Sequence, residues 1–226
     1  TNEVMFALQH SAKHKIASNY GKSYYPSDYS PNAGWADYYG NEDFFKAYPN
    51  DDRKEWNYMT EWKIKSGEII PYTESADKLP AISKYYDYDE GAPGKSAQSN
   101  GITCIYRYAE VLLMYAEAST RATNTVNQDA LNAIQEVQKR AGYQDRQIEL
   151  TTTTEPTAFL AAVSNERGWE FFAEMKRWFE LVRLEKVKEV RAEEWDASTF
   201  NTNHHYYFPV PYQQVDLAGW TNNAGY

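Results

Sequence analysis

The sequence predicts a mainly α-helical fold, and three observations lead to this expectation. Two helical apolar periodicities, in residues 105–116 and 130–141, follow one another with a short polar link between them. A third stripe with helical spacing runs from Phe159 to Val182. The first hundred residues instead hold a long aromatic segment without either period. We therefore expect a tetratricopeptide-like helical hairpin plus a long helix, with a large irregular aromatic loop region and a few short β-strands.

The region before residue 101 is expected to hold little regular structure. Alternation of Val4, Phe6 and Leu8 with other residues predicts a short, half-buried strand over residues 3–9. No period persists from Ser18 to Tyr58, where turn-forming residues recur, so this stretch is expected to be a long ordered loop. Residues 58–72 and 79–86 contain short β-compatible runs, which predict one or two hairpins, and residues 91–101 read as a connector.

The helical region follows the connector. The first helix is expected from Ile105 to about Thr120, and the second is expected to begin at an Asn127 cap and end at Gly142. A longer helix with Pro156 in its first turn should run toward residue 190, with at most one break, and residues 206–226 should form an extended wrap. One helical hairpin cannot cover both of its apolar faces, so we expect exposed apolar area and further repeats outside this sequence.

Composition excludes several classes of function. There are 23 basic and 32 acidic side chains, which give a formal charge of −9, the wrong sign for a nucleic-acid surface. Cys104 is the only cysteine, so neither an internal disulfide nor a thiol metal cluster is possible. No apolar run approaches the roughly 20 residues that a membrane helix needs. The common nucleophile and nucleotide motifs are missing, so no cofactor is expected.

Acidic and histidine clusters are the remaining candidates for chemistry. Glu166, Glu170 and Glu174 recur at intervals of four residues with arginines nearby, which favours structural ion pairs over the paired carboxylates of a glycoside hydrolase. No third ligand accompanies the histidines at positions 10 and 14, the adjacent histidines at 204 and 205 point apart, and the acidic turn at 87–91 lacks the distal Glu of a calcium loop. We therefore predict no metal site and no catalytic residue.

Four segments together resemble one protein family. They are RYAEVLLMYAEA (107–118), ALNAIQEVQKRAG (130–142), NERGWEFFAEMKRWFELVR (165–183), and YYFPVPYQQV with NNAGY (206–226). In this order they are similar to the carboxy-terminal half of the SusD/RagB family, and TNEVMFALQHS (1–11) and YPNDDRK (48–54) are similar to its central region. The resemblance therefore spans residues 1–226 as one domain, with a loop and short-strand region (1–100) and a helical region with its tail (101–226). The amino-terminal half is expected to be absent.

The resemblance implies a non-catalytic lipoprotein at the bacterial outer-membrane surface. Such proteins capture oligosaccharides, and in some relatives peptides, for a SusC-like TonB-dependent transporter. Attachment to the membrane would be through a lipid anchor on the missing amino-terminal part. Two other readings stay open: a glycoside hydrolase, or a tetratricopeptide-type scaffold that would display an apolar groove for a protein partner.

The resemblance also directs attention to the aromatic loop, because sugar contacts in that family come largely from variable loops. Flat aromatic rings flanked by polar side chains suit the apolar faces and hydroxyl rims of sugars. The candidate stacking residues are Trp35, Tyr38, Tyr39, Tyr25 and Trp56. Asn32, Asp37 and Asn41 are the candidates for hydrogen bonds to hydroxyl groups.

Overall fold

The computed structural model describes residues 3–11, 13–30, 33–85, 100–190 and 206–226. It divides into two compact units, Thr1–Glu174 and Met175–Tyr226, so the boundary falls inside the region expected to form one long helix. Asn32, His204, His205, the acidic turn at 87–91 and most of the 91–101 connector lie outside the described residues.

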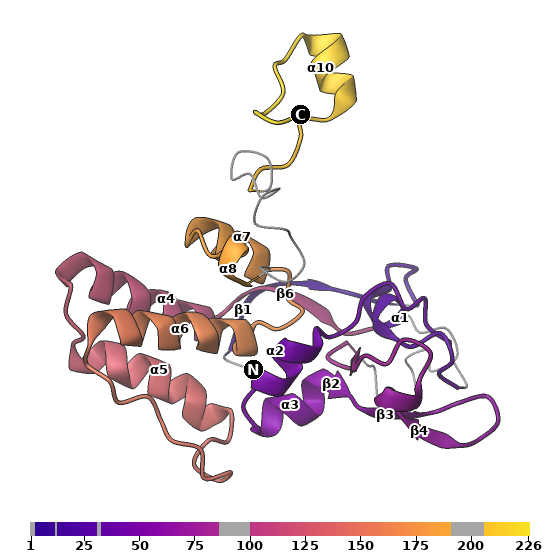
Figure 1. Ribbon diagram of the computed structural model, residues 1–226, viewed down its shortest axis with the longest axis horizontal. Helices are drawn as coiled ribbons and strands as arrows, with labels where there is room; N and C mark the ends of the chain where they lie inside the picture. Colours follow the sequence, from indigo (N-terminus) through magenta and orange to yellow (C-terminus); the bar gives the residue numbers. More distant parts are fainter. Residues whose placement is uncertain (1–2, 12, 31–32, 86–99, 191–205) are drawn as a thin grey trace. The chain divides into compact units, whose positions relative to one another are not determined.

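Three long helices form the body of the first unit and lie side by side (Figure 1). They are α4 (Tyr108–Thr123), α5 (Gln128–Arg140) and α6 (Pro156–Glu170). The predicted cap of α5 is confirmed, since Asn127 Oδ1 accepts the Ala130 amide hydrogen at 2.8 Å. Pro156 stands in the first turn of α6 as expected, where its missing N–H costs nothing.

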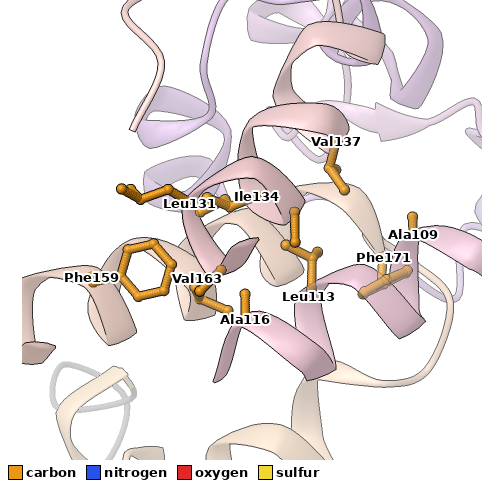
Figure 2. Packing of buried hydrophobic residues seen from close by; sticks show 11 residues of the cluster. Ala109, Leu113, Ala116, Leu131, Ile134, Val137, Phe159, Val163 and Phe171 are labelled. Carbon is orange, nitrogen blue, oxygen red and sulfur yellow. The ribbon is translucent and has the colours of Figure 1, made fainter. Parts of the chain in front are cut away.

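The core of this unit lies between these helices (Figure 2). Leu113 and Ala116 of α4, Ile134 of α5, and Phe159 and Val163 of α6 are all fully buried. Burying a side chain the size of Leu, Ile or Phe stabilises a fold by about 1.5–3 kcal/mol. The stripes predicted for α5 and for the start of α6 therefore face inward, but the stripe predicted for the first helix was wrong in part, because Tyr108 is 47% exposed and the fully buried Leu113 did not belong to it.

A two-stranded antiparallel sheet joins the start of the chain to α4. Its strands are β1 (Val4–Gln9) and β6 (Ile102–Arg107). The prediction of a strand near residues 3–9 is confirmed, but the expected half-buried face is wrong, because Phe6 and Leu8 are 56% and 52% exposed. The helix predicted from Ile105 was also placed too early, since this residue belongs to β6 and α4 begins at Tyr108.

The stretch predicted as one long loop contains three short helices, so that prediction was wrong in part. They are α1 (Tyr20–Tyr24), α2 (Glu42–Ala47) and α3 (Asp52–Asn57), and the last two are capped by Asn41 and Asp51. The predicted hairpin exists as β3 (Glu61–Lys63) paired with β4 (Ile69–Pro71). A second pairing joins β2 (Tyr58–Met59) to β5 (Ala81–Ile82), and a 3₁₀ turn, η1, spans Tyr72–Glu74.

The second unit contains α7 (Arg177–Arg183), α8 (Val187–Val190) and α10 (Tyr212–Ala218). The expectation of a long helix with at most one break is wrong, because the helix is interrupted between α6 and α7 and again between α7 and α8. The backbone is left-handed at Ala173 (φ 58°) and Met175 (φ 60°) in the first interruption and at Glu185 (φ 56°) in the second. The extended tail was wrong in part, because α10 forms within it and ends at Gly219, whose φ is 67°. No helix among the residues described above is both long and apolar enough to cross a bilayer.

Candidate functional site

The exposed aromatic residues of the first unit include two on a short segment, residues 34–38, that is fixed to α1 and the turn after it. The Trp35 amide donates to the Lys22 carbonyl at 2.7 Å, and the Asp37 amide donates to the Ser23 carbonyl at 2.9 Å. Two further amide donors in the segment, those of Gly34 and Ala36, bond to the carbonyls of Pro26 and Tyr25. Although irregular, the 34–38 segment is therefore held in place by main-chain hydrogen bonds.

Trp35 and Tyr38 present their rings from this segment. Their side chains are 52% and 61% exposed. Lys22 Nζ lies 5.4 Å from the centroid of the Trp35 ring, and the Tyr38 ring lies 5.7 Å from the buried ring of Tyr24. Each ring thus contacts a protein neighbour, while more than half of the residue's surface stays exposed. A ring with an exposed surface can stack on a flat ligand.

Tyr39 lies next to these residues but is tied to the protein by its hydroxyl. It is half-buried, and its hydroxyl donates to Asp77 Oδ2 at 2.5 Å. Burial, followed by the hydrogen bond to the Asp77 carboxylate, raises the pKa of Tyr39 above its ordinary value. The Tyr39 hydroxyl is therefore protonated and already engaged, so only the partly exposed ring is left to contact a ligand.

Two of the three polar candidates can be placed. Asp37 is exposed on the 34–38 segment, beside both exposed rings in sequence. Asn41 is exposed too, but its Oδ1 caps α2 by accepting from the Phe44 amide at 2.9 Å, so a ligand could use its side-chain NH₂ and the second lone pair of Oδ1.

The structure corrects the expectation for Tyr25. Only 5% of this residue is exposed, and its ring packs edge-on against Tyr29 with 5.4 Å between centroids. The Tyr25 carbonyl also lies so close to Gly34 that a Cβ there would meet its oxygen at 2.0 Å. Tyr25 therefore packs against the 34–38 segment in the interior, and its ring is not open to a ligand.

Trp56 lies at a different place, on α3. It is 64% exposed and lines a cavity of about 450 Å³ together with Tyr85, Lys84 and Arg140. Tyr85, which the sequence did not single out, stacks on Tyr24 at 5.7 Å. Since Tyr24 also contacts the Tyr38 ring, a chain of ring contacts leads from this cavity to the 34–38 segment. Lys22, beside Trp35, is a second neighbour that no sequence pattern indicated.

The three glutamates of the 166–174 stretch are structural, as predicted, although their partners were not foreseen. Glu166 and Glu170 of α6 pair with Arg53 at 2.6 and 2.8 Å, and Arg107 Nη2 contacts Glu174 at 2.8 Å. All three carboxylates are buried, so these pairs are interior ones between distant segments, not exposed pairs along one helix. Burial raises the pKa of Glu170, but Arg107, Arg140 and Arg53 outweigh it and lower this pKa to about 2.

Metal binding finds no support within the described parts of the chain, where no group of three or more His, Cys, Asp or Glu side chains is placed to hold an ion. His10 shows the reason at one candidate position. Its Nε2 is 2.8 Å from Thr103 Oγ1 and its Nδ1 is 3.2 Å from the Ile16 carbonyl, so both ring nitrogens have partners in the protein.

Comparisons with known proteins agree with this architecture. SusD-like protein P2 of Formosa agariphila is 28% identical over 200 residues, which are 80% of this chain and 39% of that protein. A SusD superfamily crystal structure from Parabacteroides distasonis superposes with a TM-score of 0.77 at 24% identity, over 99% of this chain and 50% of the other. Surface glycan-binding protein A of Bacteroides thetaiotaomicron, in complex with laminarihexaose, gives a TM-score of 0.71 at 22% identity, over 98% and 52%.

These likenesses share one feature, which is that the chain spans about half or less of each relative's length. The two structural matches show a common, mainly helical fold. The sequence model of the SusD family matches residues 60–226, which is more than half of the chain and includes all of its long helices. The chain therefore belongs to the SusD family.

Proposed function

We propose that this chain takes part in non-catalytic capture of glycans at the bacterial outer-membrane surface. The observation that carries the proposal is the pair of exposed rings, Trp35 and Tyr38, on a segment fixed by main-chain hydrogen bonds. A rigid aromatic surface loses little conformational entropy when a sugar ring stacks on it. The laminarihexaose complex of a protein with the same fold supports a glycan as the ligand class.

The binding surface that we propose consists of Trp35, Tyr38, the partly exposed ring of Tyr39 and the carboxylate of Asp37. The flat rings meet the apolar faces of sugar units, while Asp37 accepts hydrogen bonds from hydroxyl groups. Trp56 belongs to the cavity on α3 and is proposed as a second contact for a ligand long enough to reach it. The candidate site thus lies in residues 1–100, and residues 101–226 supply its helical support and the tail.

Delivery and location follow from family membership as further proposals. The captured glycan is passed to a SusC-like TonB-dependent transporter. The protein is held at the cell surface by a lipid anchor on a part outside this sequence.

A non-catalytic role is supported by the state of the carboxylates. Glycoside hydrolysis needs two carboxyl groups that reach the substrate, one as an acid and one as a base or nucleophile. The buried glutamates Glu166 and Glu170 instead satisfy guanidinium groups in the interior. The hydrolase reading therefore loses its strongest candidates.

Titration calorimetry of the complete protein against a panel of oligosaccharides tests the proposal. We expect an intact oligosaccharide to bind. Trp35→Ala and Tyr38→Ala should each raise its Kd by roughly tenfold or more. Trp220→Ala is the matched control, because this tryptophan is similarly exposed at 58% but belongs to the second unit.

Each alternative predicts a distinct result. Shortened sugars in the calorimeter's sample cell after the titration would mean that the protein is a hydrolase. Binding of peptides with no response to any sugar would assign the surface to peptide capture. Unchanged affinity in both Trp35→Ala and Tyr38→Ala would mean that the 34–38 segment is not the binding surface.

A further inference from the structure

A polar groove borders the amino-terminal end of the 34–38 segment. Its volume is about 610 Å³, which lies in the range of small-molecule sites. Its walls are the turn after α1 and the β3–β4 hairpin. The side chains in these walls that can contact a ligand through polar groups are those of Ser27, Asp28, Tyr29, Ser30, Lys65 and Ser66. We call this site the serine groove.

Hydrogen bonds hold the two walls of the serine groove together. The Ser30 amide donates to the Lys63 carbonyl at 2.8 Å, which joins the main chains of the turn and the hairpin. Trp62, only 3% exposed, donates from Nε1 to Asp28 Oδ1 at 2.7 Å, which joins their side chains. The groove is therefore preformed, so a ligand that enters it loses little affinity to the ordering of the protein.

The serine groove and the aromatic segment share one main-chain acceptor. The Pro26 carbonyl accepts the Tyr29 amide hydrogen at 3.2 Å and the Gly34 amide hydrogen at 2.9 Å. Ala33, the residue directly before the segment, also lines the groove. The ring contacts that lead to the cavity on α3 begin instead at Tyr38, the other end of the segment. The groove is thus a separate extension of the aromatic surface.

The side chains of the groove include hydrogen-bond donors and acceptors. Serine hydroxyls can do both, and the Lys65 ammonium donates. The Asp28 carboxylate has about four acceptor positions, so it can accept more than its bond from Trp62. Sugar hydroxyl groups need this mixture of donors and acceptors. Because one ammonium and one carboxylate cancel in charge, the groove favours a neutral sugar unit over an acidic one.

We propose that the serine groove binds a neutral sugar unit of the same glycan whose neighbouring units stack on Trp35 and Tyr38. This inference rests on the proposed function and adds a second subsite to it. Affinity then depends on the length of the glycan. A disaccharide occupies the aromatic surface alone, whereas a hexasaccharide occupies the aromatic surface and the groove.

Calorimetry of the complete protein with short and long neutral sugars tests the inference. The probes are the disaccharide and the hexasaccharide of the laminari-, malto-, manno- and xylo-oligosaccharide series. Lys65→Ala removes the ammonium donor from the groove. Lys63→Ala is the matched control, because Lys63 is also exposed on this hairpin but is not among the residues that line the groove. We expect Lys65→Ala to raise the Kd of the hexasaccharide by about threefold or more and to change that of the disaccharide by less than about twofold.

A second variant changes the opposite wall of the groove. Asp28→Asn keeps an oxygen that can accept from Trp62 but removes the carboxylate. We expect the same dependence on glycan length as for Lys65→Ala, whereas Trp35→Ala should raise the Kd of both sugars. Because a disaccharide does not reach the groove, it is also the sugar for which a substitution in the hairpin turn serves as a control.

The possible failures are distinguishable. If Trp35→Ala weakens hexasaccharide binding but neither groove variant does, the groove is not a subsite and the proposed function stands. Equal losses for the disaccharide and the hexasaccharide in Lys65→Ala would mean that the substitution disturbs the aromatic segment, which would also overturn the inference. Tighter binding of an oligogalacturonate than of any neutral sugar would contradict the neutral ligand. Absence of binding to every sugar would overturn the proposed function and this inference together.

Discussion

Arg53 of α3 and Glu166 of α6 form a buried ion pair, with 2.6 Å between Nη1 and Oε1, across 113 residues of sequence. The same guanidinium donates to Asp51 and to Glu170, so its acceptors come from the aromatic region and from the helical core. This arrangement fixes the short helix α3, and with it Trp56, against α6.

Replacement of this arginine should be strongly destabilising. We expect Arg53→Met to lower the free energy of unfolding by about 3–5 kcal/mol, because Glu166 and Glu170 keep their buried carboxylates and lose a shared partner. Urea unfolding measures the change. Arg146→Met serves as a control, since that arginine pairs with Asp52 and Glu55 at the surface, and a loss as large as that for Arg53→Met would refute the assignment.

Acid should weaken the fold partly through Glu170. Its pKa falls from an ordinary 4.5 to about 2 in the folded protein, so the unfolded chain binds this proton more readily. The stabilisation that the ionised Glu170 carboxylate provides is complete above a pH of about 4.5 and is lost as the pH falls toward 2. We expect Glu170→Gln to be less stable at neutral pH and to lose less further stability on acidification. An unchanged difference between unfolding free energies at pH of about 6 and 3 would count against this role.

The cap of α5 offers a milder prediction. Asn127→Ala removes the acceptor of the Ala130 amide hydrogen and should lower the free energy of unfolding by about 1 kcal/mol. Asn132→Ala, in the middle of the same helix and exposed, should have a smaller effect or even a stabilising one, because alanine is the better helix former there. Equal losses for the two variants would show that Asn127 does not act as a cap.

A substitution at Gly34 tests whether glycan binding depends on the position of the 34–38 segment. A Cβ on Gly34 would meet the Tyr25 carbonyl oxygen at 2.0 Å, so Gly34→Ala should shift the 34–38 segment and weaken glycan binding. Gly67→Ala is the control: it strains the hairpin turn, but its Cβ would meet only Lys63 Cε at 3.9 Å. Calorimetry with an oligosaccharide that the protein binds is the measurement. Retained affinity in Gly34→Ala would mean that the segment need not be held in this position.

The long helices could be predicted from sequence because their cores repeat locally. Ala116, Ile134 and Phe159 each lie on a predicted stripe with helical spacing, and all three are fully buried. The start of α4 was misplaced because Ile105 fits the helical stripe equally well. Its place in β6 depends on pairing with β1, about a hundred residues away, which no local pattern encodes.

The candidate site was harder to predict because exposure is a tertiary property. Tyr25 and Tyr38 occur in the same aromatic stretch, yet one is 5% exposed and the other 61%. What separates them is the contact with Gly34 and the fold of the turn after α1, neither of which follows from composition. The helices α2 and α3 were missed because six residues are too few to establish a period, although Asn41 and Asp51 are typical capping residues.

The main-chain anchoring of residues 34–38 has an evolutionary consequence. Because amide and carbonyl groups hold the segment to α1, most substitutions at positions 35, 37 and 38 leave those bonds intact. The chemistry of this surface can therefore diverge between lineages by single mutations, at little cost to folding, while the buried arginines and glutamates remain under strong constraint.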